Sequence, residues 1–109
     1  MKKLILCIAK EFSKTPGPRT QDEGDFSGEV FLNTILKPRF EDAIRQNAKL
    51  IVDLDGTEGY ATSFLEASFG GLARIHPENL VLNTIEFITK DEPFLKEEIE
   101  GYIREARIK

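Results

Sequence analysis

The fold is decided by a strand–helix–strand segment, residues 50–88, which reads LIVDLDGTEGYATSFLEASFGGLARIHPENLVLNTIEFI. Residues 50–54 form a short apolar run that is typical of a buried strand, and Asp55-Gly56 ends this run with a turn signal. Residues 57–62 continue as a turn region. A helix should begin after this turn, because the apolar residues that follow it recur at helical spacing.

This helix is expected to end at His76-Pro77, since a proline disfavours helical geometry in the residue before it. Its apolar face is formed by Leu65, Phe69, Leu72 and Ile75. Gly70 and Gly71 lie within it, and each glycine costs about 1 kcal/mol relative to alanine in a helix. Close approach of a neighbouring helix or strand explains such a pair better than a ligand does. Residues 81–88 are expected to form the next strand.

The residues before this segment predict a strand, a long loop and a helix. Residues 3–9 form a run rich in Leu and Ile, which indicates a buried first strand. Residues 11–27 carry proline, glycine and polar residues; this loop is unusually long for a small domain and is therefore a candidate binding element. A helix is expected over residues 29–36 and, after a break or kink at Pro38, as far as about residue 47.

The residues after the segment predict a final helix over residues 91–109, in which Glu100 and Arg104 form a favourable pair one turn apart. The predicted order of elements is therefore β-loop-α-β-α-β-α. This alternation predicts a single small α/β domain over residues 1–109, with a mixed or mostly parallel sheet and helices packed against it.

Composition and charge argue against several classes of function. The 109 residues are 40% hydrophobic and 31% charged, which suits one globular domain with one core. The net charge is −4 without a basic stripe, so we expect no nucleic-acid partner. The lone cysteine, Cys7, excludes an internal disulfide and a cysteine-rich metal site, and we expect it to be a buried strand thiol. We expect no metal and no cofactor.

Hydropathy predicts a protein that does not enter a membrane. No apolar stretch approaches the roughly 20 residues that cross a bilayer. The run at residues 4–8 is also shorter than the roughly 7–15 residues of a secretion-signal core. We therefore expect a cytoplasmic protein.

The end of the second strand resembles a phosphatase motif. Residues 50–57 are similar to the first motif of haloacid dehalogenase-like phosphatases, in which one aspartate attacks a phosphoryl group and the next acts as acid and base beside magnesium. The resemblance would assign these roles to Asp53 and Asp55. Only 52 residues follow Thr57, too few for the doubly wound domain and the further polar groups of such enzymes. We expect instead that both aspartates bond to the strand end and the following turn.

A second pattern spans most of the chain: a strand, a turn and a helix start, preceded by another helix start after a loop. Its residues are 51–54 (IVDL), 62–72 (TSFLEASFGGL), Ser27, Gly28, Glu29 and Phe31, with Gly17 and Arg19 in the loop. Over roughly residues 3–90, this pattern resembles the uncharacterised bacterial STAS-like domain, a relative of the anti-sigma factor antagonists.

The resemblance implies a binding protein that is switched by phosphorylation. In anti-sigma factor antagonists, a histidine-kinase-like ATPase partner phosphorylates a Ser or Thr at the start of the helix after a central strand, and binding is then lost. Matching the strand and the turn places Ser63 at that position, with Thr62 as the second choice. Ala61 and Phe64 stand where antagonists typically have Asp and Gly.

Two interpretations of Ser63 stay open on the sequence. Ser63 and Glu66 have the Ser-x-x-Glu spacing of a capping box, in which each side chain satisfies a free backbone N–H at the helix start. A phosphate on Ser63 would also be favoured there by free N–H groups and by the helix dipole. It would add about two negative charges to a surface that carries Glu58 and Glu66, so a docked partner should be repelled.

A second candidate cluster consists of Arg19, Ser27, Gly28 and Glu29. A loop that enters a helix through Ser-Gly can bind an anion with its N–H groups, and Arg19 can assist. The alternative is that Ser27 caps the helix and Arg19 pairs with an acidic residue of the same loop. The single histidine, His76, is expected to cap carbonyls at a helix end rather than to catalyse a reaction.

The first hypothesis for function is therefore a non-catalytic regulatory module that binds a protein partner. The loop before the first helix and the start of the Ser63 helix would form the docking surface, and the resemblance suggests a histidine-kinase-like ATPase as the partner. Two alternatives stay open: a domain that binds a nucleotide or another anion through residues 17–28, and a magnesium-dependent phosphatase that uses Asp53 and Asp55.

Overall fold

The chain folds around a three-stranded parallel sheet. The computed structural model describes residues 2–17 and 26–106 of the 109 residues. The strands are β1 (Lys3–Cys7), β2 (Lys49–Asp53) and β3 (Ile85–Ile88), in the spatial order β1-β2-β3. Leu6 of β1 is level with Val52 of β2, which is level with Phe87 of β3. The prediction of a mostly parallel α/β domain is confirmed.

The helices form two long segments between the strands and one after the last strand. Each of the first two long segments contains a π-helical turn, η2 or η3, between α-helical parts. The bounds are α1 (Ile8–Glu11), α2 (Gly28–Phe31), η2 (Leu32–Leu36), α3 (Lys37–Arg45), α4 (Thr62–Leu65), η3 (Glu66–Gly70), α5 (Gly71–Ile75), α6 (Glu78–Thr84) and α7 (Leu95–Glu105).

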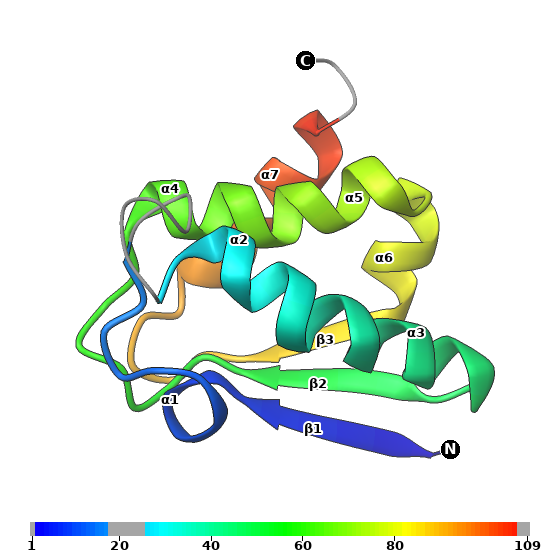
Figure 1. Ribbon diagram of the computed structural model, residues 1–109, viewed down its shortest axis with the longest axis horizontal. Coiled ribbons are helices and arrows are strands. Elements are labelled where there is room, and N and C mark those ends of the chain that lie inside the picture. Colours follow the sequence, from blue (N-terminus) through cyan, green and yellow to red (C-terminus); the bar gives the residue numbers. More distant parts are fainter. Residues whose placement is uncertain (1, 18–25, 107–109) are drawn as a thin grey trace.

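The long helical segments all lie on one side of the sheet (Figure 1). Parallel crossovers are right-handed, and here the strands follow one another in sequence order, so both crossovers pass over the same face. The core lies between this face and the helices. Its fully buried side chains include Leu6, Leu50, Val52, Phe31, Phe40, Phe64, Phe69 and Ile99.

Pro38 does not break the first long segment, in contrast to the simplest expectation from sequence. It lies in the first turn of α3, immediately after the π-helical turn η2. The N–H of Lys37 bonds to the carbonyl of Leu32, five residues back, which is the wider π spacing. A proline conflicts with the carbonyl four residues before it, so a widened turn at this point lets the helix continue.

The glycine pair in the second long segment is explained by close packing, as predicted. A Cβ atom on Gly71 would lie 2.7 Å from Cδ2 of Leu32, so η2 approaches the second segment closely at this point. A Cβ atom on Gly70 would lie 2.9 Å from Oε2 of Glu66 and 3.6 Å from the carbonyl oxygen of Tyr102 in α7. Glycine therefore occupies both positions, although it is a poor helix former, because a side chain would block these close contacts.

Three predicted boundaries were wrong. The third strand begins at Ile85, because the preceding residues form α6, in which Val81 and Thr84 are the buried positions at helical spacing. The first strand ends at Cys7, which is half-buried rather than buried, and α1 follows. The last helix begins at Leu95, because residues 89–92 form a turn whose Thr89 hydroxyl donates to the carbonyl of Glu92 at 2.5 Å.

Candidate functional site

The candidate site lies where the two long helical segments begin, at the end of the domain to which the strands point (Figure 1). A Cβ atom on Gly28 would lie 2.6 Å from the carbonyl oxygen of Phe64 and 2.9 Å from Cβ of Ala67. The start of α2 therefore packs directly on α4. This contact places the start of α2 against Phe64 in the first turn of α4 and against Ala67 in η3. We call residues 27–29 and residues 61–63, which begin the two helices, together the helix-start surface.

At the start of α2, Ser27 of the predicted cluster uses its side chain for a hydrogen bond within the helix. Ser27 is fully buried, and its Oγ accepts a hydrogen bond from the N–H of Val30 at 3.1 Å. The prediction that Ser27 caps the helix is confirmed. Gly28 is also buried, so Glu29 is the member of the cluster whose side chain is exposed. Arg19 lies outside the described residues.

The start of α4 is built differently, and the predicted capping box is wrong. The residue at the N-cap is Ala61, and no side chain caps this helix. Ser63 is the second residue of the helix and is half-buried, whereas Thr62 before it is exposed. Phe64 and Leu65 donate to the carbonyl of Ala61 at 3.0 and 3.2 Å. The geometry of a helix leaves the N–H groups of the first residues without an intrahelical acceptor.

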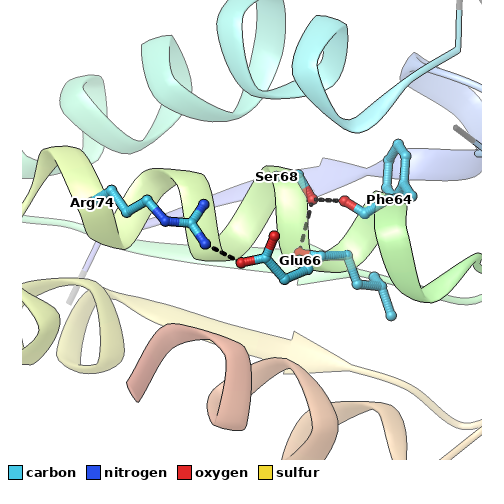
Figure 2. Close-up of polar contacts among 5 residues, drawn as sticks. Phe64, Glu66, Ser68 and Arg74 are labelled. Carbon is cyan, nitrogen blue, oxygen red and sulfur yellow. Dashed lines mark hydrogen bonds and ion pairs between the residues drawn. The ribbon is translucent and has the colours of Figure 1, made fainter. Parts of the chain in front are cut away.

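Glu66 does not reach back to the helix start. Its carboxylate is buried, with 8% of the side chain exposed, and it forms an ion pair with Arg74 two turns further along (Figure 2). Gly70 makes room for this carboxylate by lacking a Cβ atom. The expectation that Glu66 adds negative charge to the docking surface is therefore wrong. The glycine four residues after Glu66 is the sequence feature that indicated crowding at this point.

Beside this ion pair, Ser68 satisfies the backbone of the π-helical turn. Its hydroxyl is buried and donates to the carbonyl of Phe64 at 2.8 Å, as Figure 2 shows. The same carbonyl faces Gly28 of the other helix start. The carbonyl of Phe64 in α4 is therefore next to both Gly28 of α2 and Ser68 of η3.

Two tyrosines that the sequence analysis did not single out lie near this part of the molecule, and one of them, Tyr60, holds the start of α4. Tyr60 donates from its hydroxyl to the carbonyl of Leu54 at 2.8 Å, and its ring packs on Phe64 with centroids 6.0 Å apart. Burial raises the pKa of Tyr60 above its ordinary value. Tyr102 of α7 donates to Oε2 of Glu98 at 2.9 Å, and burial and this carboxylate raise its pKa as well.

An aromatic cluster lies beneath the helix-start surface. The Phe12 ring is 5.1 Å from that of Phe31 and 5.9 Å from that of Phe64, and Phe26 meets Phe12 edge-on at 5.7 Å. Phe26 is 49% exposed, so an aromatic side chain lies at the surface directly before Ser27. Sequence periodicity could not find this cluster because Phe12 and Phe26 lie in irregular segments.

The two aspartates at the end of β2 accept hydrogen bonds from backbone N–H groups of the adjoining turns, as predicted. Asp53 Oδ1 accepts from the N–H of Asp55 at 3.0 Å, and Asp55 Oδ1 accepts from the N–H groups of Lys90 and Asp91 at 2.8 and 2.9 Å. The carboxylate of Asp91 in turn accepts from the N–H of Gly56 at 3.1 Å. Within residues 2–17 and 26–106, no group of three His, Cys, Asp or Glu side chains is arranged to hold a metal ion.

Two further sequence candidates have structural partners. Glu58 is exposed, and its N–H donates to the carbonyl of Lys14 at 2.8 Å, which joins the turn before α4 to the segment after α1. His76 Nε2 lies 2.9 Å from Oε2 of Glu41, and its ring packs on Phe40 with centroids 5.0 Å apart. His76 thus contacts a carboxylate of the neighbouring helix, which differs from the expected role at helical carbonyls.

Comparison with known proteins assigns the chain to a family. No curated protein and no solved structure matches it. In the described part of the chain, no helix combines the length and apolar character needed to cross a membrane. The family model of the STAS-like domain of unknown function matches residues 27–95, which include both parts of the helix-start surface, β2 and β3. This match covers more than half of the chain, and the protein therefore belongs to the family of STAS-like domains of unknown function.

Proposed function

We propose that this domain is a non-catalytic regulatory module that docks on a protein partner through the helix-start surface. We propose further that phosphorylation of Ser63, or of Thr62, weakens this docking. The observation that carries the proposal is the contact of Gly28 with Phe64, which joins two segments that are distant in sequence into one surface. Both segments belong to the part of the chain that defines the family.

The exposed side chains around this surface suit a protein partner. Phe26 is 49% exposed beside the start of α2, and Glu29, Glu58 and Thr62 are exposed around the two helix starts. Exposed aromatic residues are enriched among those that dominate binding energy at protein interfaces, and charged residues typically form the rim. The aromatic cluster beneath Phe26 supports it from below, so a partner would meet a preformed surface.

The start of α4 also suits a phosphate-controlled switch. Ser63 forms no cap, so a phosphate there would not disrupt an existing structural bond. The N–H groups and the dipole at the start of this long helical segment favour an anion. A phosphate adds about two negative charges, which would repel a partner whose surface complements Glu29 and Glu58. The resemblance to anti-sigma factor antagonists makes a histidine-kinase-like ATPase the partner that we propose.

The test is affinity capture from the native host with three forms of the protein, read by mass spectrometry. These are the wild type, Ser63→Glu and Asn79→Glu. Asn79 is exposed and is the second residue of α6, so Asn79→Glu adds the same charge at the same helical position away from the proposed surface. We expect an ATPase partner that is retained by the wild type and by Asn79→Glu and lost by Ser63→Glu. Equal thermal melting temperatures would establish that all three forms are folded.

Two results would contradict the proposal. Retention of the same partner by all three forms would mean that the start of α4 lies outside the interface. Absence of a specific partner, together with a thermal shift on adding nucleotides that Arg19→Ala removes, would instead favour a small-ligand domain. A phosphorylated residue 62 or 63 in protein purified from the native host would support the switch independently of the capture experiment.

A further inference from the structure

The sheet has a second face that the described helices do not cover. The long helical segments lie on one side of the sheet, and α1 is a single turn beyond the end of β1 (Figure 1). Parallel sheets are normally covered on both faces, because their strands are apolar on both sides. An open second face in a parallel sheet therefore needs an explanation.

The strand register defines the side chains of this open face. Successive side chains of a strand point to opposite faces, and Leu6, Leu50 and Val52 are buried against the helices. The open face therefore carries three rows of level residues. These rows are Lys3 and Lys49; Ile5, Ile51 and Glu86; and Cys7, Asp53 and Ile88.

The open face combines an apolar centre with opposite charges at its two ends. Ile5 is 64% exposed, the largest exposed fraction of any large apolar residue in the described part of the chain. Lys3 and Lys49 lie where the strands begin, and Asp53 lies where β2 ends. We propose that this face binds a second copy of the chain, in a symmetric dimer in which the two open faces stack with their strands antiparallel.

The charges select this arrangement over the other symmetric one. A two-fold axis across the strands places each strand over its own copy in the reverse direction. Lys49, whose ammonium also donates to the carbonyl of Asn83 in its own molecule, then lies over Asp53 of the second copy, twice by symmetry. Ile5 and Ile51 lie over their own copies, and Ile5 supplies most of the apolar contact because Ile51 is only 9% exposed. A two-fold axis along the strands would place Lys49 over Lys49 and Asp53 over Asp53. Opposed charges stabilise the first stacking and like charges oppose the second.

Glu86 is the charged residue that the first stacking places over its own copy, so two like charges face each other there. It lies on the edge strand β3 and is exposed, and stacked sheets cross at about 30°, which separates their edges. Water therefore screens this pair at the rim of the contact. The central strand β2, with Lys49, Ile51 and Asp53, decides the orientation.

The size of the face predicts a weak dimer. Two strands of five residues and one of four, about 4.8 Å apart and at about 3.3 Å per residue, present a face of roughly 220 Å². Stable interfaces bury about 800 Å² per partner, so this contact belongs with transient associations unless flanking residues extend it. The dimer should form at high protein concentration and should weaken as salt is added.

The inference goes beyond the proposed function and uses a different surface, and sedimentation equilibrium over a range of concentrations tests it. We expect the wild type to self-associate and Ile5→Lys to weaken association by about tenfold or more. The matched control is Ile75→Lys, because Ile75 is 49% exposed on α5, on the helical side of the molecule, and should leave association unchanged. A wild type that stays monomeric at about 1 mM would overturn the proposal.

A second variant separates face stacking from pairing of the exposed edge strand β1. Lys49 lies on the central strand, which cannot take part in edge pairing. Face stacking predicts that Lys49→Glu weakens association by about tenfold, because it places two carboxylates over each other at two points. If Ile5→Lys weakens association while a folded Lys49→Glu does not, β1 edges pair instead and the proposal is wrong. Thermal melts establish that the variants are folded.

Discussion

The starts of α2 and α4 lie side by side and are built in opposite ways. At α2, the serine before the helix is fully buried and caps it, and the next residue is a glycine pressed against the neighbouring helix. At α4, the residue before the helix is Ala61, no side chain caps it, and Ser63 follows as the second helical residue. Two serines at adjacent helix starts therefore have different roles.

The difference separates a half of the surface whose polar groups stabilise the fold from a half that, on the proposed function, is available for regulation. The polar groups of Ser27 are used within the fold, so changing them should change stability. Ser63 is not used in a cap, and Tyr60 holds its helix through the bond to the carbonyl of Leu54 and through packing on Phe64. On the proposed function, we therefore expect a modification at Ser63 to alter binding without altering the fold.

The largest expected effect is that of Gly28→Ala at the start of α2. The new Cβ atom would lie 2.6 Å from the carbonyl oxygen of Phe64, which is backbone and cannot rotate away. We expect the free energy of unfolding to fall by about 3 kcal/mol, measured by urea denaturation.

Gly101→Ala is the matched control for this substitution. Gly101 lies in α7, and an added Cβ atom would meet nothing within 4 Å. It should stabilise the protein by about 0.5–1 kcal/mol through helix propensity. Equal effects of the two substitutions would mean that α2 and α4 are not in close contact in solution.

Ser27→Ala should have the next largest effect. It removes the cap and leaves the N–H of Val30 without the oxygen that now accepts it. Loss of an N-cap costs about 1–2 kcal/mol when the site is buried, as Ser27 is. A midpoint of urea denaturation equal to that of the wild type would show that Ser27 is not a structural residue and would remove the contrast with Ser63.

Tyr60→Phe should lower the free energy of unfolding by about 1 kcal/mol at neutral pH, because the bond to the carbonyl of Leu54 is lost. Its pH dependence is more specific. Burial raises the pKa of Tyr60 above the ordinary value of 10.0, so above pH 10.0 the unfolded chain releases a proton that the native protein keeps. The free energy of unfolding should then fall by up to about 1.4 kcal/mol per pH unit.

This alkaline loss of stability should be smaller in Tyr60→Phe than in the wild type, because the substituted ring cannot ionise. Urea denaturation at pH values on either side of 10.0 measures the difference, and lysine titration is common to both proteins. Parallel curves for the two proteins would mean that Tyr60 is solvated in solution. The start of α4 would then lack the contact by which Tyr60 holds it.

The sequence predicted the architecture better than the site. Apolar runs and helical spacing identified β1, β2 and both long helical segments, and the end at His76-Pro77 was correct, because these features are set by local patterns. The predicted start of β3 was wrong. Residues 81–84 are apolar enough for a strand, and they form a helix because Val81 and Thr84, which lie on one helical face, are the positions that pack into the core.

At the site, the sequence identified residues but not their partners. Ser27 as a cap and the turn bonds of Asp53 and Asp55 were predicted, since each involves neighbours in the chain. Glu66 was misassigned, because the local Ser-x-x-Glu spacing does not reveal that its carboxylate is buried and paired with Arg74, eight residues further along. The Gly28–Phe64 contact depends on tertiary packing and could not be predicted from either segment alone.

Ala61→Ser tests the same comparison of the two helix starts by changing the one that has no cap. Ala61 occupies the N-cap of α4 with φ −70° and ψ 139°, an extended geometry that suits a capping serine. The substitution should give α4 the cap that α2 has, and should raise the free energy of unfolding by about 0.5–1 kcal/mol. Thermal denaturation measures this gain. A destabilised variant would show that residue 61 is constrained by contacts other than those of a cap.

The smallest expected effect is the one on which the phosphorylation proposal depends most. Ser63→Ala should change the free energy of unfolding by no more than about 0.5 kcal/mol, because Ser63 forms no cap and alanine is a good helix former. Urea denaturation beside Ser27→Ala makes the comparison direct. A loss above about 1 kcal/mol would mean that the Ser63 hydroxyl makes a structural bond in solution. Loss of a partner in Ser63→Glu would then reflect a damaged helix start rather than added charge, and the two helix starts would be alike after all.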